Sequence, residues 1–298
     1  MIVLSTVTKT FNKTVAVDKL DLEIPAGSIF GLLGPNGAGK TTTIRMIMNI
    51  IRPDHGEIRI GGKFITDEIY RRIGYLPEER GLYQKSKLKE TIVYFATLKG
   101  LSRTAAVQQT DYYLKKFNLT GYAERKIEEL SKGNQQKVQF IIAIVHQPEI
   151  IILDEPFAGL DPINQLLLKQ IITEFQADGK TVIFSAHQME QIEKLCSRIC
   201  LINAGRRILY GDLKEIKKNY GVKKFKIQFE GEKSQLTDLI REAWTINDSV
   251  ISGSLSHTTE INDILKKVIA RVTVTHVDIE EPSLEQIFID LVKGASDQ

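Results

Sequence analysis

Residues 34–41 place glycines, a lysine and a threonine in the order G-x-x-x-x-G-K-[ST]. An apolar strand is expected before this stretch, at 28–33, and a helix after it, at 41–51. Glycines let backbone N–H groups converge on phosphate oxygens, while the lysine and the helix N-terminus add positive charge. We therefore predict a nucleotide-binding phosphate loop made of Gly34, Pro35, Asn36, Gly37, Ala38, Gly39, Lys40, Thr41 and Thr42.

A second chemical signal follows the apolar run 150–153, which leads directly into Asp154 and Glu155. Such a run predicts a buried strand that delivers Asp154 to its carboxyl end, where α/β sheets bind ligands. There Asp154 is expected to hold Mg²⁺ together with the Thr41 hydroxyl. Glu155 can orient and deprotonate an attacking water. A solvated helix cap is the alternative for an isolated Asp-Glu pair, and the phosphate loop argues against it.

Residues 130–136 read LSKGNQQ, a polar turn with a glycine that leads into the apolar run 138–145. This pattern predicts the N-terminus of a buried helix, which is a natural place to hold an anion. Because the chain already contains a phosphate loop, the turn raises the question of which anion it binds.

The elements that position these residues alternate between strand and helix. Short apolar strands are expected at 2–7, 20–24, 28–33, 57–60, 73–76, 150–153 and 181–185, with helices at 164–176 and 189–195. This alternation predicts an α/β fold with a largely parallel, helix-covered sheet. Between 87 and 145 the pattern is mostly helical, so a helical subdomain is expected there.

The composition changes at 213–226, where the chain carries six lysines. Beyond it we expect a small α+β domain with strands at 226–229 and 272–279 and helices at 234–243, 260–269 and 283–292. Ser283 and Gln286 resemble a capping box for the last of these helices. The predicted domains are therefore 1–218 and 219–298. We expect the lysine run to be a solvated linker, with contact to anionic lipid headgroups as the alternative.

Composition limits the class of partner. The 298 residues carry 40 Lys and Arg against 37 Asp and Glu, a net charge of +3. This balance lacks the bias of a dedicated nucleic-acid binder, so no nucleic-acid partner is expected. No apolar run approaches the ~18 residues of a membrane span, so we expect a soluble chain. The two cysteines, Cys196 and Cys200, are expected to be packing residues rather than a disulfide or metal site.

These motifs occur in a diagnostic order: Phe11, the phosphate loop, GYLPE at 74–78, LSKGNQQ, IIILDEP at 150–156, GLD at 159–161, and His187. Over residues 1–218 this order resembles the nucleotide-binding subunit of ABC transporters. The resemblance implies a P-loop NTPase of ABC type with a mostly parallel core sheet, an antiparallel β subdomain and a helical subdomain. The segment EEPSLEQIFIDLV resembles the C-terminal module of exporter-type ATPases, which include sodium-extrusion and drug-resistance systems.

The resemblance also assigns roles to single residues. It implies that Phe11 stacks on adenine with Val17 packing beside it, and that Glu155 and His187 are catalytic, His187 at the γ-phosphate. It implies that Asp161 couples two nucleotide sites across a dimer. The residues expected to contact the ATP of a second subunit are Ser131, Lys132, Gly133 and Asn134.

Two motifs depart from the family pattern, at three positions in total. The family usually has glutamine where this chain has Glu78. A carboxylate can ligate Mg²⁺ but cannot donate a hydrogen bond unless protonated, so metal contact is expected and water orientation stays open. The family also has glycine and glutamine where this chain has Lys132 and Asn134. Lys132 either approaches a phosphate or points to solvent, and we favour solvent.

We therefore expect an ATPase subunit of a multi-subunit exporter that uses ATP and Mg²⁺. It is expected to dimerise with ATP, as a homodimer or heterodimer, and to act on a separate polytopic membrane subunit from the cytoplasmic side of the membrane. The 87–145 segment and the turn at 77–83 are expected to contact that subunit. Sodium or a drug as substrate rests on resemblance alone. A soluble ABC-type ATPase acting on ribosomes or DNA and a P-loop kinase or GTPase are the alternatives.

Overall fold

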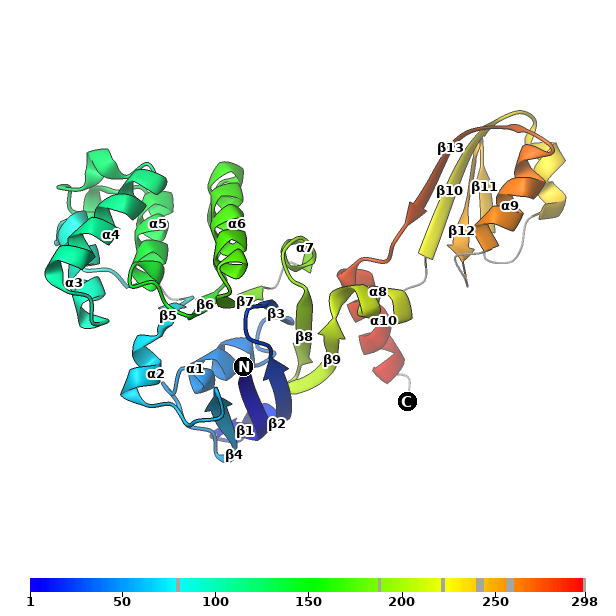
Figure 1. Ribbon diagram of the computed structural model, residues 1–298. Helices are drawn as coiled ribbons and strands as arrows, with labels where there is room; N and C mark the ends of the chain where they lie inside the picture. Colours follow the sequence, from blue (N-terminus) through cyan, green and yellow to red (C-terminus); the bar gives the residue numbers. More distant parts are fainter. Residues whose placement is uncertain (79–80, 187–188, 221–222, 240–243, 256–259, 297–298) are drawn as a thin grey trace. The chain divides into compact units, whose positions relative to one another are not determined.

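The computed structural model describes residues 1–78, 81–186, 189–220, 223–239, 244–255 and 260–296 (Figure 1). The chain forms two compact units, Met1–Asp212 and Leu213–Gln298. The sequence placed the boundary after residue 218. The structure places it before α8 (Leu213–Tyr220), because this helix packs against α10 (Leu284–Ser296) of the second unit.

The first unit is built on a six-stranded sheet with the order β5-β6-β7-β3-β8-β9, in which only β9 runs antiparallel. The strands are β3 (Ile29–Leu33), β5 (Ile73–Leu76), β6 (Ile150–Asp154), β7 (Thr181–Ala186), β8 (Arg198–Asn203) and β9 (Arg206–Asp212). Every residue of β3 and β7 is buried, as expected when helices cover both faces of a parallel sheet. The predicted mostly parallel core sheet is confirmed.

An antiparallel sheet of order β2-β1-β4 packs beside this core. Its strands are β1 (Ile2–Phe11), β2 (Thr14–Ile24) and β4 (His55–Ile60). Buried residues of this sheet, of α1 (Lys40–Ile47) and of the core sheet form one hydrophobic cluster. The other face of the core sheet carries α6 (Pro162–Ala177), which contacts β3 and β7. Helix α1 is therefore held in the core by its buried face, with its N-terminus at the end of β3.

Three helices form a separate layer on the β5 side of the first unit (Figure 1). They are α3 (Leu88–Leu98), α4 (Arg103–Lys116) and α5 (Lys132–Ile144), and the short α2 (Asp67–Arg71) precedes β5. Ser102 and Ser131 cap α4 and α5 by accepting a backbone N–H three residues on, at 3.3 Å in each case. The predicted helical subdomain is confirmed.

The second unit contains an antiparallel sheet of order β11-β12-β10-β13 covered by α9 (Glu260–Ile269). The strands are β10 (Lys223–Glu230), β11 (Trp244–Asn247), β12 (Val250–Leu255) and β13 (Thr273–Glu280). The helix predicted at 234–243 is a 3₁₀ turn, Lys233–Leu239, and residues 240–243 lie outside the described residues. Ser283 caps α10 by accepting the Gln286 N–H at 3.1 Å.

Cys196 and Cys200 are buried and unlinked, as predicted. Within the described ranges, none of the helices combines the length and the apolar character needed to cross a membrane.

Candidate nucleotide site

The phosphate loop depends on glycine for two reasons, backbone conformation and space. Gly34 and Gly39 have φ angles of +149° and +105°, which L side chains rarely adopt. A Cβ on Gly34 would lie 2.1 Å from the Ile202 carbonyl oxygen, and one on Gly39 would lie 2.4 Å from that of Ala16. Neighbouring backbone therefore encloses the loop, and the glycine spacing in the sequence reflects that enclosure.

Lys40 opens α1 directly after the loop and is only 6% exposed. Its ammonium donates to the carbonyl oxygens of Gly34 at 2.8 Å and Pro35 at 3.2 Å, so it is held over the loop. The loop borders a cleft of about 200 Å³, and this cleft brings together nine of the predicted site residues. It is lined by Ala16, Asn36, Gly37, Ala38, Gly39, Lys40, Thr41, Thr42, Glu78 and Glu155.

Asp154 lies at the carboxyl end of β6 and is 1% exposed. The Ser185 hydroxyl donates to its Oδ1, while no described residue bonds its buried Oδ2. Burial raises the pKa of Asp154, and the Ser185 hydrogen bond opposes that rise. The Thr41 hydroxyl donates to Glu78 at 3.3 Å. A buried, unpaired carboxylate oxygen beside a hydroxyl and a second carboxylate fits a divalent cation such as Mg²⁺.

Glu155 follows Asp154 with a φ of +51°, a strained conformation for a side chain of this size. Its backbone N–H donates to the Ser185 hydroxyl at 3.0 Å. The Ser185 hydroxyl therefore fixes both acidic residues: it donates to the Asp154 carboxylate and accepts from the Glu155 backbone N–H. No sequence motif predicts a role for Ser185. The available signal was a lone hydroxyl at the end of an apolar strand, 181–185, next to β6.

Phe11 and Val17 lie on the hairpin formed by β1 and β2. Phe11 is 46% exposed, and the Lys9 ammonium lies 5.5 Å from its ring centroid. Val17 is fully buried in the core beneath the loop, and its neighbour Ala16 lines the cleft instead. An exposed aromatic ring fits base stacking, whereas a fully buried Val17 is placed to support the loop.

The LSKGNQQ turn caps α5 and does not line the cleft of its own chain. Ser131 and Lys132 are exposed, and a Cβ on Gly133 would meet nothing within 4 Å. Asn134 donates its backbone N–H to the Ser131 hydroxyl, which satisfies one amide of the first turn of α5. Among the other predicted residues, Asp161 caps α6 by accepting the Asn164 N–H at 2.9 Å, and His187 lies outside the described residues.

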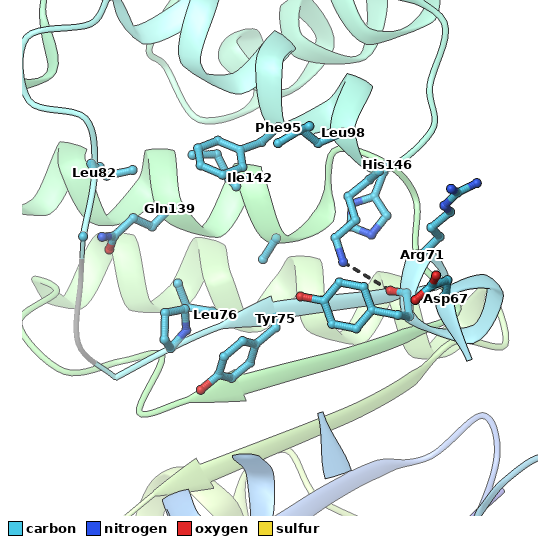
Figure 2. Close-up of a pocket in the computed structure, with 15 residues that line it drawn as sticks. Asp67, Arg71, Tyr75, Leu76, Leu82, Phe95, Leu98, Gln139, Ile142 and His146 are labelled. Atoms are coloured by element: carbon cyan, nitrogen blue, oxygen red, sulfur yellow. Dashed lines mark hydrogen bonds between the residues drawn. The ribbon is translucent and has the colours of Figure 1, made fainter. Parts of the chain in front are cut away.

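A larger cavity, of about 460 Å³, lies between β5 and the helical layer (Figure 2). We call this cavity the β5–α5 groove. Figure 2 shows Phe95, Leu98 and Ile142 from α3 and α5 on one side, and Leu76 from β5 across from them. The turn that was expected to contact a partner contributes Pro77, Gly81 and Leu82.

The β5–α5 groove contains polar atoms with unmet hydrogen-bonding capacity. Neither Gln139 Oε1 nor His146 Nδ1 has a partner among the described residues, although both atoms are buried. His146 Nε2 lies 3.3 Å from the Ile73 carbonyl oxygen, and the Lys99 ammonium donates to the Tyr70 and Ile73 carbonyl oxygens at 3.2 and 3.0 Å. Burial lowers the pKa of Lys99 to about 8. Burial and the Lys99 charge lower the pKa of His146 to about 4.

Comparison with known proteins agrees with this geometry. The family model "ABC transporter" matches residues 17–158, and the model "ATP-binding protein DrrA1-3-like, C-terminal domain" matches 211–292. The chain is 42% identical over 98% of both chains to an uncharacterised ABC transporter ATP-binding protein, YhaQ of Bacillus subtilis. It is 30% identical over 95% of both chains to the linearmycin resistance ATP-binding protein LnrL of the same organism.

The fold has solved counterparts as well. The dimeric structure of MJ0796, a bacterial ABC transporter cassette, superposes with a TM-score of 0.66 at 27% identity. It covers 72% of this chain and 99% of that one. A relative with 42% identity over nearly the full length is sufficient to assign the family. The chain therefore belongs to the family of ATP-binding subunits of ABC transporters.

Proposed function

We propose that this chain is the ATP-hydrolysing subunit of a multi-subunit exporter. The observation that carries the proposal is the convergence of the phosphate loop, Glu155 and the metal-binding candidates Thr41, Glu78 and Asp154 at one edge of the core sheet. Phosphoryl transfer to water requires a positioned nucleophile and compensation of charge on the transferred group. The residues at this edge fit both requirements.

Each residue at the cleft has a distinct task in this proposal. The loop N–H groups and Lys40 bind the phosphates, and Lys40 offsets their negative charge. Glu155 orients the attacking water and accepts its proton. Thr41, Glu78 and Asp154 would hold Mg²⁺, which when bound neutralises charge on the phosphate oxygens. We infer His187 to contact the γ-phosphate, as its place in the family motif implies.

Two copies are proposed to close around ATP. The exposed Ser131 and the open N-terminus of α5 suit an anion, yet they do not line the cleft of their own chain. A second copy arranged head to tail would bring them to the partner's nucleotide. The similar cassette MJ0796 was solved as a dimer, which supports this arrangement. Asp161, at the start of α6, is proposed to couple the two sites.

The membrane subunit is proposed to dock in the β5–α5 groove from the membrane side, with this chain at the cytoplasmic face. The apolar walls from Phe95, Leu98 and Ile142 suit a helix or loop of a partner, and the buried acceptors Gln139 Oε1 and His146 Nδ1 suit its hydrogen-bond donors. Similarity to a linearmycin resistance protein supports export. A drug or sodium is the proposed substrate class.

The test replaces Glu155 with Gln. Glu155→Gln should still bind ATP, because phosphate contacts stay intact, but its hydrolysis should be at least roughly tenfold slower, a barrier increase of about 1.4 kcal/mol. The matched control is Glu68→Gln, since Glu68 is exposed on α2 and is absent from the cleft. Phosphate release at saturating Mg-ATP measures the rate. Near-normal turnover by Glu155→Gln would remove the proposed base.

A further inference from the structure

Gln136 makes a connection that the predicted motifs do not account for. It is the last residue of LSKGNQQ and lies on the second turn of α5, and its side chain is 3% exposed. Its amide Nε2 donates to the carbonyl oxygens of Pro156 at 2.9 Å and Ala158 at 2.8 Å. Both protons of one amide are therefore used on a single neighbouring segment, the one that follows Glu155.

This segment carries Glu155 at one end and Asp161 at the other. At its start, Glu155 has a φ of +51° and its N–H is bound by Ser185. At its end, Asp161 caps α6, and Gln165 donates to the Leu160 carbonyl oxygen at 3.1 Å. Gln136 fixes the middle from outside the core sheet. A strained backbone conformation persists only where the surrounding structure holds it in place. The contacts of Ser185, Gln136 and Gln165 hold the segment that contains the strained Glu155.

The chemistry of the contact is specific to glutamine. Two backbone carbonyls need two donors, and a primary amide supplies both from one nitrogen. A glutamate of the same shape would place carboxylate lone pairs against carbonyl lone pairs. An apolar residue of similar volume would remove the donor from both carbonyl oxygens. Leaving a buried carbonyl oxygen without a hydrogen bond costs more free energy than an ordinary hydrogen bond contributes to stability. Gln136→Met therefore removes the contact with the two carbonyls, and Gln136→Glu replaces it with repulsion.

The two ends of this contact serve different nucleotides in a dimer. The capped end of α5 bears Ser131, which does not line the cleft of its own chain, and the Pro156–Ala158 segment directly follows Glu155, which lines it. We propose that Gln136 is a positioning residue that couples the LSKGN turn to the catalytic glutamate of the same chain. Engagement of Ser131 by the partner's nucleotide is thereby transmitted to Glu155. This coupling rests on the proposed function.

The first experiment tests the contact without nucleotide. Hydrogen–deuterium exchange in the full chain should be faster at amides 157–161 in Gln136→Met than in wild type. The control is Gln135→Met, since Gln135 Nε2 donates to two carbonyls, Ile127 and Leu130 at 3.1 Å each, that precede α5 rather than follow Glu155. Equal protection of 157–161 in wild type and Gln136→Met would overturn the proposal. This readout does not depend on ATPase activity, so it stands apart from the proposed function.

The second experiment separates positioning from folding. At saturating Mg-ATP, Gln136→Met should lower kcat about tenfold, equivalent to about 1.4 kcal/mol, while KM stays within about twofold. In the Glu155→Gln background it should leave ATP-driven dimerisation, measured by size exclusion, unchanged. Gln136→Glu should be at least as slow as Gln136→Met.

Other outcomes discriminate clearly. If both Gln136→Met and Gln136→Glu kept the wild-type kcat, the Gln136 contact would have no effect on catalysis. That result would overturn the proposed coupling of the LSKGN turn to Glu155. Loss of dimerisation together with kcat in Gln136→Met would also overturn it, because the residue would then only support α5. If the wild-type chain showed no ATP hydrolysis that depends on Glu155, the proposed function would be refuted. Hydrogen–deuterium exchange at 157–161 would still show whether Gln136 holds this segment, because that measurement needs no ATPase activity.

Discussion

The nucleotide cleft and the β5–α5 groove lie in the same unit but are built differently. The cleft is formed mainly by backbone: glycines at positive φ, the N-terminus of α1 and carbonyls that hold Lys40. The groove is formed mainly by side chains, with apolar walls and buried polar atoms that lack partners among the described residues. The backbone of one chain therefore forms the loop that binds the phosphates, and in the proposed dimer Ser131 of a second copy approaches the same nucleotide. A site with unmet hydrogen bonds fits a surface that a partner completes.

This difference determines how each region should respond to substitution. A backbone site tolerates almost no added atoms, because neighbouring carbonyls cannot move aside independently. A side-chain groove should accept change without loss of folding, and some changes should stabilise the isolated chain. Substitutions in the loop should therefore have larger effects than substitutions in the groove.

The largest effect is expected from Gly39→Ala in the phosphate loop. At φ +105° any side chain is strained, and the added Cβ would lie 2.4 Å from the Ala16 carbonyl oxygen. Strain of about 1–2 kcal/mol from the backbone conformation alone would be increased by the clash, so ATP affinity should fall at least roughly a hundredfold. Isothermal titration with ATP measures the loss.

Gly37→Ala is the matched control for that substitution. Gly37 has a φ of +79° in the same loop, yet a Cβ there would meet nothing within 4 Å. It carries only the conformational strain, so its loss of affinity should be about tenfold. Equal losses in the two variants would show that space at Gly39 is unimportant and would contradict the view of a backbone-enclosed loop.

The same contrast explains which parts of the molecule the sequence revealed. The loop, Asp154 and the turn that caps α5 depend on glycines, a strand end and a capping serine at fixed spacing, so their positions follow from residue type. The parallel core followed from continuous apolar runs such as 150–153. These features are local, and local patterns determine them.

Features that depend on distant residues were missed. The strands β11 and β12 were not predicted. The segment that contains β12, SVISGSL at 249–255, has small and polar residues that pack only once β10 lies beside it, and the four-residue β11 at the sheet edge pairs with β12. The β5–α5 groove joins residues 67–99 with 139–146, which no motif connects. Ser185 and Gln136 act through contacts 30 and 20 residues away along the chain. No local pattern indicates such contacts.

A smaller effect, of opposite sign, is expected in the groove from Gln139→Met. Gln139 is 9% exposed, and its Oε1 has no partner among the described residues. Replacing it by an apolar side chain of similar volume removes an unsatisfied acceptor, so the free energy of unfolding should rise by about 1–2 kcal/mol. Urea denaturation of the isolated chain measures this, with Gln170→Met on the exposed face of α6 as the control.

The same variant tests whether the groove binds the membrane subunit. If a partner donates to Gln139 Oε1, Gln139→Met should co-purify less efficiently with its co-expressed membrane subunit while its ATPase activity in isolation is retained. Increased stability with unchanged association would show that the partner does not use this acceptor. Decreased stability would mean that the groove tolerates substitution no better than the phosphate loop does.

The smallest effect is expected from His146, whose pKa is lowered from 6.5 to about 4, first by burial and then by the Lys99 charge. A cationic group with a lowered folded-state pKa binds more protons when the chain is unfolded, so stability rises with pH between these two values and falls on acidification. From pH 7 to pH 6 the expected loss is about 0.7 kcal/mol. Gln at this position does not titrate, so His146→Gln should reduce the slope of Tm against pH over this range. A slope that persists in His146→Gln would show that the imidazole is not kept neutral by the groove, and would weaken the view that its Nδ1 is an acceptor held ready for a partner.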